Sequence, residues 1–405
     1  MATLLPIVLL LANADLTGSV RMEAQAGEAP TITNPVSSFY EAALLRPDIT
    51  LQLSSPTTET RVFEALRLFL RRPKITNREG PLYLNMLQAE HTGHSGERLK
   101  WAFRLNSTAG EVDYVALSQV LGQQATLPDT LNIFTADASG SIGYRLTRQW
   151  RLDSQVAVLR RQTWGSTQPA GTSAPPVGSP PAGASLPTET DASLEPRLEF
   201  AMSRRQIGQL RVKFTHYDLA GSTQLEATEV EARLGWRYQL ARHHELQLEA
   251  GIAVASAPQP SDPTRPWTSL SPLAKVLLAS SLPLTPTTFL RSRASGEVLW
   301  YLDPVLGVAL PRGQIDANLA IEVNPSWMFE VYVQAATDIS RHPLPDSPIE
   351  TFISAGAPLR YRVNRNWLVE LGGRYSQRGP HLTAPDFSLG QTELLGYLAV
   401  TATTR

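Results

Sequence analysis

Charged and apolar residues alternate without a break over residues 229–240, which read EVEARLGWRYQL. After the linker ARHH, the alternation resumes over residues 245–254 as ELQLEAGIAV. Successive side chains of a β-strand point to opposite faces, so each run predicts a strand with one apolar and one polar face. A short polar linker between two such runs is typical of an antiparallel hairpin.

This hairpin unit recurs along most of the chain. Short polar turns are expected at 147–150, 203–206, 324–327 and 363–367, and apolar residues alternate on both sides of each. The connections between hairpins are longer and richer in Pro, Gly, Ser and Thr; they include 54–60, 93–96 and the longest, 164–194. We therefore expect an all-β chain with short turns at one end of its hairpins and long loops at the other.

A single transmembrane antiparallel β-barrel has this layout, with short periplasmic turns, long extracellular loops and strands of about ten residues. A propeller would need four short strands in each unit, and a sandwich has shorter strands with similar turns at both ends. We expect about 18 strands, with 16 as the alternative, and both termini at the short-turn side. The first five are the least regular, and 61–71 would also suit a helix; we place these five at 47–54, 61–70, 81–92, 97–107 and 111–121.

The polar faces of these strands carry charges that a soluble core would not tolerate. In a wide barrel the same side chains would line a lumen filled with water. The lumen-lining candidates are Glu229, Glu231, Arg233, Arg237, Glu249, Lys275, Arg291, Arg293, Glu370 and Arg374. Because they carry both signs, they predict weak ion selectivity and many groups that can hydrogen-bond a hydrated cargo.

Three tryptophans, Trp150, Trp327 and Trp367, each end a short turn and begin the next strand. Aromatic rings gather at the membrane–water interfaces of barrels, so these three predict a periplasmic girdle in contact with outer-membrane lipid. The alternative for them is packing against a soluble hydrophobic core.

The N-terminus is typical of a secretory signal peptide over 1–14, because an apolar run at 4–12 leads into Ala12-Asn13-Ala14. Cleavage is expected after Ala14, with Ala26 as a second candidate. No Lys or Arg precedes the apolar run, and an N-terminal strand is the alternative. We expect a poorly ordered periplasmic extension over 15–46 and the barrel over 47–405, with an extracellular loop at 164–194.

Composition and motifs exclude several other classes of protein. The chain has no cysteine, so it forms no disulfide framework and no Cys-ligated metal site. Lys plus Arg (36) nearly equals Asp plus Glu (37), which argues against nucleic acid as a partner. Nucleotide-binding, zinc-hydrolase and serine-hydrolase motifs are absent. The remaining pairs are His91 with His94, His216 with Asp218, and His381 with Asp386. Nothing in their spacing favours a site, so we expect no enzyme, no catalytic residue, no metal and no cofactor.

The hairpin layout over residues 47–403 resembles bacterial outer-membrane β-barrel porins. More narrowly, RQW at 148–150, NRNW at 364–367 and DPVLG at 303–307 resemble barrels that accompany exopolysaccharide export in myxobacteria and relatives. This resemblance implies a pore in the outer membrane of a Gram-negative bacterium. Such a pore carries a secreted polysaccharide from a periplasmic export protein to the cell surface. The alternatives are a general small-solute porin, a plugged structural or adhesive barrel and, last, an outer-membrane hydrolase. One departure is the C-terminus, which ends in Arg405 where many barrels have an aromatic residue that the assembly machinery reads.

Overall fold

The computed structural model describes residues 13–31, 34–72, 82–113, 130–164, 188–220, 225–259, 262–303, 308–338, 351–379 and 391–404. They form 18 strands: β1 (Asn13–Thr31), β2 (Asn34–Ser54), β3 (Thr58–Arg72), β4 (Leu82–Ser95), β5 (Leu99–Asp113), β6 (Thr130–Arg145), β7 (Trp150–Trp164), β8 (Thr188–Ala201), β9 (Gln206–Ala220), β10 (Leu225–Ala241), β11 (His244–Gln259), β12 (Asp262–Pro283), β13 (Phe289–Asp303), β14 (Val308–Asn324), β15 (Trp327–Asp338), β16 (Thr351–Arg362), β17 (Trp367–Gly379) and β18 (Gln391–Thr404). No helix in these ranges is long and apolar enough to cross a membrane.

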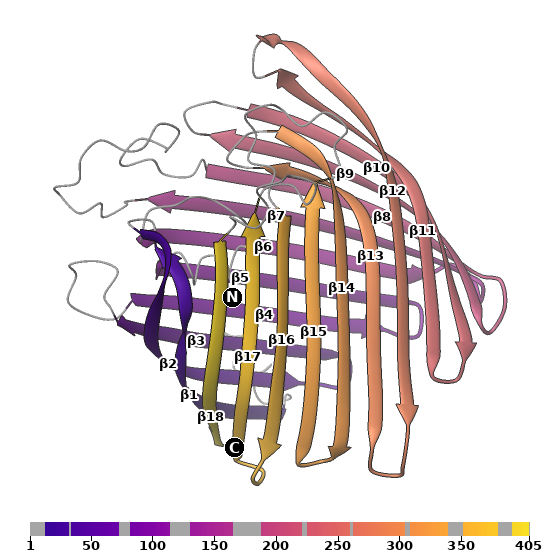
Figure 1. Ribbon diagram of the computed structural model, residues 1–405. Helices are drawn as coiled ribbons and strands as arrows, with labels where there is room; N and C mark the ends of the chain where they lie inside the picture. The colour runs from indigo at the N-terminus through magenta and orange to yellow at the C-terminus, as the bar shows by residue number, and fades with distance from the viewer. Residues whose placement is uncertain are drawn as a thin grey trace, which may run out of the picture.

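The strands close into one barrel. Each strand pairs antiparallel with its neighbours in sequence, and β1 pairs with β18 as well as with β2. Closing a sheet in this way requires the strands to tilt. Figure 1 shows this as β13–β18 running steeply across the front while β3–β7 cross behind them. The expected antiparallel barrel of 18 strands is confirmed.

Eight connections lie at the end of the barrel where Thr404 pairs close to the start of β1, and we call this the short-turn end. They are 55–57, 96–98, 146–149, 202–205, 242–243, 284–288, 325–326 and 363–366. Side-chain oxygens accept backbone N–H groups in six of these turns, and in three of the six a tryptophan is a donor. Oδ1 of Asn324 accepts the backbone N–H of Trp327 at 3.0 Å, and Asn364 does the same for Trp367 at 3.0 Å. Oγ1 of Thr147 accepts that of Trp150 at 3.1 Å. Such local bonds are why Asn and Thr suit tight turns.

The outer face of the barrel carries large apolar side chains that remain exposed. On β10, for example, Leu234 is 68% exposed, and on β12 Leu270 is 69% exposed. Others on the same face are Val20, Ile49, Phe103, Val156, Phe214, Ile252, Val276, Ile315, Leu371 and Leu398. A soluble protein does not leave so large an apolar surface in water, and a belt of this kind is typical of a transmembrane barrel. The chain therefore has the architecture of a transmembrane β-barrel.

The periplasmic extension expected over 15–46 is wrong, because β1 and the first part of β2 occupy these residues. Strand β1 does alternate, but it uses small residues such as Gly18, Ala24 and Ala26 on its outer face, so the apolar signal is weak. Strand β2 is apolar on both faces, because Tyr40 and Leu44 lie on the inner face, and this hides the period of two. Residues 1–12 of the expected signal peptide lie outside the described residues.

The strand expected at 111–121 is also wrong in its bounds. Residues 111–113 end β5, and 114–129 lie outside the described residues. From the sequence, a separate strand is counted at 111–121 and β1 is left out. The two errors cancel, so the predicted number of strands is right, but two connections are predicted at the wrong end of the barrel. Turns 55–57 and 96–98, expected on the long-loop side, lie at the short-turn end. Residues 61–71 belong to β3 and not to a helix, and 188–194 of the expected long loop belong to β8.

Candidate functional site: the inner wall of the barrel

The ten lumen-lining candidates lie on the face opposite the apolar belt. In β10, buried Glu229, Glu231 and Arg233 alternate with exposed Val230 and Leu234. The strand register continues this face around the barrel through β11, β12 and β13 and across β16 and β17. Five candidates are buried, three are half-buried and two are exposed: Glu229, Glu231, Arg233, Glu249 and Glu370; Arg237, Lys275 and Arg374; Arg291 and Arg293. Their part in transport stays a prediction.

Arg233 is the centre of a first group of ion pairs, which we call the β10 network. Its Nη1 lies 2.7 Å from Oε1 of Glu297 and 3.8 Å from Oε2 of Glu249, and its Nη2 lies 3.0 Å from Oε2 of Glu231. Only 4% of the Arg233 side chain is exposed. Because Glu297 belongs to β13, the guanidinium spans three strand positions across the curved inner wall.

Further cations complete the β10 network. Nζ of Lys275 lies 3.0 Å from Oε2 of Glu297, and Nη2 of Arg211 lies 3.1 Å from Oε2 of Glu249. The amide of Gln247 donates to Oε1 of Glu249 at 2.7 Å. Arg211 also lies 4.0 Å from Oε1 of Glu195, which lies 2.9 Å from Nη2 of Arg197. The network thus holds four cations and four carboxylates: Arg197, Arg211, Arg233 and Lys275 with Glu195, Glu231, Glu249 and Glu297. Its charges neutralise one another.

A second group of ion pairs, the seam network, lies where the barrel closes. Glu370 of β17 accepts Nε of Arg360 at 2.6 Å and Nη2 of Arg21 at 3.0 Å. Arg360 also reaches Oε2 of Glu330 at 2.8 Å, and Arg21 reaches Oε2 of Glu23 at 2.9 Å. The first strand is therefore tied by side chains to β17, across the last strand.

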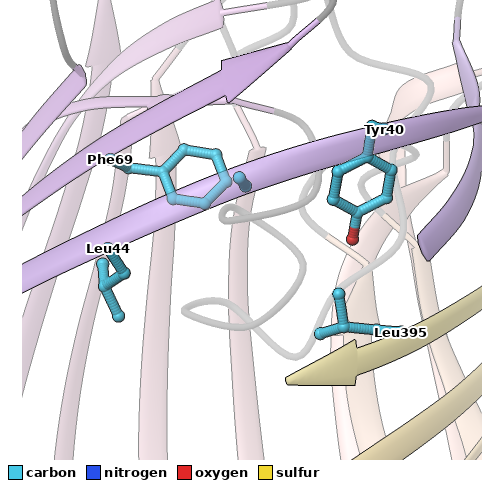
Figure 2. Packing of buried hydrophobic residues seen from close by; sticks show 5 residues of the cluster. Tyr40, Leu44, Phe69 and Leu395 are labelled. Carbon is cyan, nitrogen blue, oxygen red and sulfur yellow. The ribbon is translucent and has the colours of Figure 1, made fainter. Parts of the chain in front are cut away.

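Apolar residues interrupt the polar inner wall near the starts of β2 and β18. Tyr40, Ala42, Leu44, Phe69 and Leu395 form one buried cluster. Figure 2 shows Tyr40, Leu44, Phe69 and Leu395 approaching one another from three strands. The hydroxyl of Tyr40 donates to Oε1 of Glu393 at 3.1 Å, and Nη2 of Arg374 lies 3.4 Å from the same oxygen. The cluster therefore has a polar edge that includes one of the candidates.

Exposure of the inner wall falls from the short-turn end to the long-loop end. Near the short turns, the side chains of Arg104 and Arg291 are 52% and 58% exposed. Near the long-loop end, Tyr40, Ile133 and Leu395 are 1%, 0% and 3% exposed. Among the described residues, side chains of the inner wall are therefore more exposed near the short turns than near the long-loop end.

Trp150, Trp327 and Trp367 are the first residues of β7, β15 and β17, and all three are exposed on the outer face. The ring of Trp150 lies 4.5 Å from that of Phe200, and the ring of Trp327 lies 4.3 Å from that of Tyr361. Paired rings at the short-turn edge of the apolar belt have the position that an interfacial girdle requires. Contact with lipid itself stays a prediction.

The histidines are spread over the barrel. Nδ1 of His91 lies 2.8 Å from Oγ1 of Thr60, and His216 is exposed on the outer face, away from the lumen. Nδ1 of His244 lies 2.9 Å from Oγ of Ser280. His381 and Asp386 lie outside the described residues. Within the described ranges, no three His, Asp or Glu side chains are grouped so that they could hold a metal ion.

Comparison with known proteins shows a likeness of fold alone. No family model matches the chain, and no curated protein matches it in sequence. Among solved structures, the FrpB iron transporter from Neisseria meningitidis is similar in two variants. The F5-1 apoprotein has a TM-score of 0.54 and 8% identity, covering 94% of this chain and 66% of that one. The F3-3 variant has a TM-score of 0.51 and 7% identity, covering 90% and 62%.

The outer membrane protein opdK from Pseudomonas aeruginosa is similar to a lower degree. Its TM-score is 0.44 and its identity 10%, and the match covers 96% of this chain and 98% of that one. The chain spans less than two thirds of the length of the FrpB structures. These likenesses concern the fold of the barrel, and the cargo of this chain has to be argued from its own inner wall.

Sequence reasoning missed several members of the two networks. Arg211 and Glu297 alternate with apolar neighbours on β9 and β13, so the same period of two could have found them. Arg360 lies just before a short turn, so the sequence alone does not show whether it belongs to the strand or to the turn. The register of β16 with β17, which places Arg360 opposite Glu370, decides this. Arg21 and Glu23 lie within 15–46, where the sequence predicts a periplasmic extension and the structure has β1.

Proposed function

We propose that the chain is an outer-membrane channel for a hydrated polar cargo, and that this cargo is a secreted polysaccharide on its way to the cell surface. The observation that supports a channel most strongly is the polar inner wall, where charges of both signs form two networks of ion pairs. A lining of one sign would attract one class of ion, whereas a self-neutralised lining has little preference for small ions.

The same lining suits a sugar chain. Carboxylates, guanidinium groups and the amides of Gln209 and Gln247 present donors and acceptors along the wall of β9–β11. Sugar hydroxyls can replace water at such groups, and bridging water can preserve the remaining bonds. The resemblance of 148–150 and 364–367 to barrels of exopolysaccharide export supports the same cargo. Export also requires a periplasmic protein that delivers the polymer, and we propose such a partner.

The channel is tested by recording single channels of the purified chain in planar bilayers with a salt gradient. We expect discrete conductance steps and a reversal potential close to that of a non-selective pore. Strong selectivity for one ion sign would contradict the neutralised lining. For the cargo, the gene is deleted and surface and periplasmic polysaccharide are measured. Polymer should fall at the surface and rise in the periplasm. Unchanged surface polymer with altered solute uptake would reject export in favour of a small-solute porin.

A plugged structural barrel is the second candidate, because the inner wall is buried toward the long-loop end. It differs from the channel in one measurement: bilayers containing the wild-type chain would show no conductance steps at any voltage. Deletion would then change envelope integrity or adhesion and leave polymer and solute transport as they were.

A further inference from the structure

The short turns of the barrel carry an excess of arginine. Six arginines and one acidic residue, Glu97, lie in the eight turns: Arg98, Arg148, Arg204, Arg205, Arg242 and Arg365. Arg145 and Arg362 are the last residues of β6 and β16, beside two of these turns. All eight arginines are exposed, and no ion pair joins them to another described residue. We call these eight residues the arginine rim.

The connections at the other end of the barrel have the opposite balance of charge. Their basic residues are Lys74, Arg78 and Arg341, and their acidic residues are Glu79, Asp129, Asp346, Glu350 and Asp386. The whole chain has a formal net charge of −1, so the arginine rim does not follow from a basic composition. Among the connections alone, basic charge is therefore concentrated at the short-turn end.

The rim arginines and the outer tryptophans separate onto two sides of the same hairpins. Arg145 lies opposite Arg151 in the register of β6 and β7, on the inner side. Nε of Arg145 donates to the carbonyl of Thr147 at 3.3 Å, across the turn. Trp150, in the same hairpin, lies on the outer face. Arg362 continues the inner face of β16, while Trp367 lies on the outer face of β17. The lipid boundary thus passes through the tryptophans, and these two arginines lie toward the mouth.

We propose that the arginine rim captures an anionic polysaccharide at the short-turn mouth, which narrows the cargo of the proposed function to a chain that carries carboxylate groups. The proposal rests on that function. Several arginines of the inner wall are paired with glutamates, as Arg233 and Arg360 show. The rim arginines form no ion pair with another described residue, so their guanidinium groups can bind an anion. Their planar donors fit a carboxylate in a bidentate manner.

The distribution of the rim suits a polymer better than a single ion. Its arginines come from five turns, and the sugars of one chain can engage several of them at once. Each contact raises the effective concentration for the next, so weak exposed pairs add up along the chain. The mouth that they border is the end where the described side chains of the inner wall are more exposed. Fields of exposed charges are screened beyond about 10 Å at 0.1 M salt, so capture should weaken as salt is added.

The test measures binding of fluorescent oligogalacturonate, with one carboxylate per sugar, to the full-length chain in detergent by anisotropy. A neutral maltooligosaccharide of equal length and a poly-glutamate peptide serve as comparison probes. The variant R204Q/R205Q/R242Q removes three rim charges, and R204K/R205K/R242K keeps them. R160Q, which removes an exposed arginine from the outer face of β7, is the control at a distance.

We expect oligogalacturonate to bind more tightly than maltooligosaccharide at low salt. The triple Gln variant should lose about tenfold in affinity. The triple Lys variant should lose less, because it keeps the charge but not the bidentate geometry, and R160Q should stay within about threefold of the wild type. Equal binding of both sugars, or no loss in the Gln variant, overturns the proposal. Binding of poly-glutamate without oligogalacturonate also overturns it and assigns the rim to an acidic protein. Because this assay needs no open pore, absent conductance in bilayers would refute the channel alone.

Discussion

Replacing Arg233 by Met should lower the free energy of unfolding of the barrel by more than the loss of an exposed ion pair would. Met keeps much of the length of the side chain but removes the guanidinium that three carboxylates share. Breaking a buried ion pair from one side costs about 3–5 kcal/mol, because the partner charge is left buried without compensation. Glu249 keeps Arg211 and Glu297 keeps Lys275, whereas Glu231 loses its cation. We therefore expect a loss near the lower limit, about 3 kcal/mol.

The measurement is the free energy of unfolding in urea, followed by tryptophan fluorescence of the chain in lipid vesicles. The matched control is Arg291→Met, which removes one pair with Glu322 at 3.1 Å from a side chain that is 58% exposed. Exposed pairs contribute about 0–1 kcal/mol, so this variant should remain close to the wild type. In the double variant R233M/E231Q, part of the loss should be restored. If R233M and R291M lost the same free energy, the reasoning on the β10 network would be refuted.

Other features give three more predictions. Leu234→Arg should cost about 2–4 kcal/mol of unfolding free energy in vesicles, because the side chain would face lipid near mid-strand; Gln149→Arg in a short turn should cost little, and equal losses would contradict the lipid-facing belt. If a signal peptide is removed, mass spectrometry of the mature chain should find Asp15 as its first residue. Cleavage after Ala26 would remove most of β1 together with Arg21, so a folded barrel that begins at Gly27 would contradict the role of β1. Protease added to intact cells should cut within 165–187 and spare Arg204-Arg205; cleavage at Arg204-Arg205 would place the short turns outside.

The hairpin of β10 and β11 shows how far a period of two can lead. Its alternation predicts the strands, the face toward lipid and the buried charges together, because a strand with lipid on one side and water on the other has to separate the two residue types. β2 shows where this reasoning ends. Tyr40 and Leu44 make its inner face apolar, so both faces look alike in sequence, and a sequence offers no sign of the partner strands that bury them.

The networks of the inner wall show a second limit. Sequence places Glu249 and Glu370 on a polar face but does not give the curvature that brings Glu297 of β13 to Arg233 of β10. Nor does it give the closure that brings β1 beside β18. Both depend on contacts between residues far apart in the chain, which local patterns do not encode.

The seam network can form only after strands from both ends of the chain have come together. Arg21 and Glu370 are 349 residues apart, and the strand that separates them in the barrel, β18, is the last strand of the described residues. Closing a loop of that size is slow, and contacts of this range delay folding in general. One edge of β1 therefore stays unpaired until β18 pairs with it. Any chaperone of the periplasm that holds this chain has to protect that edge longest, since an unpaired edge strand is a site of aggregation.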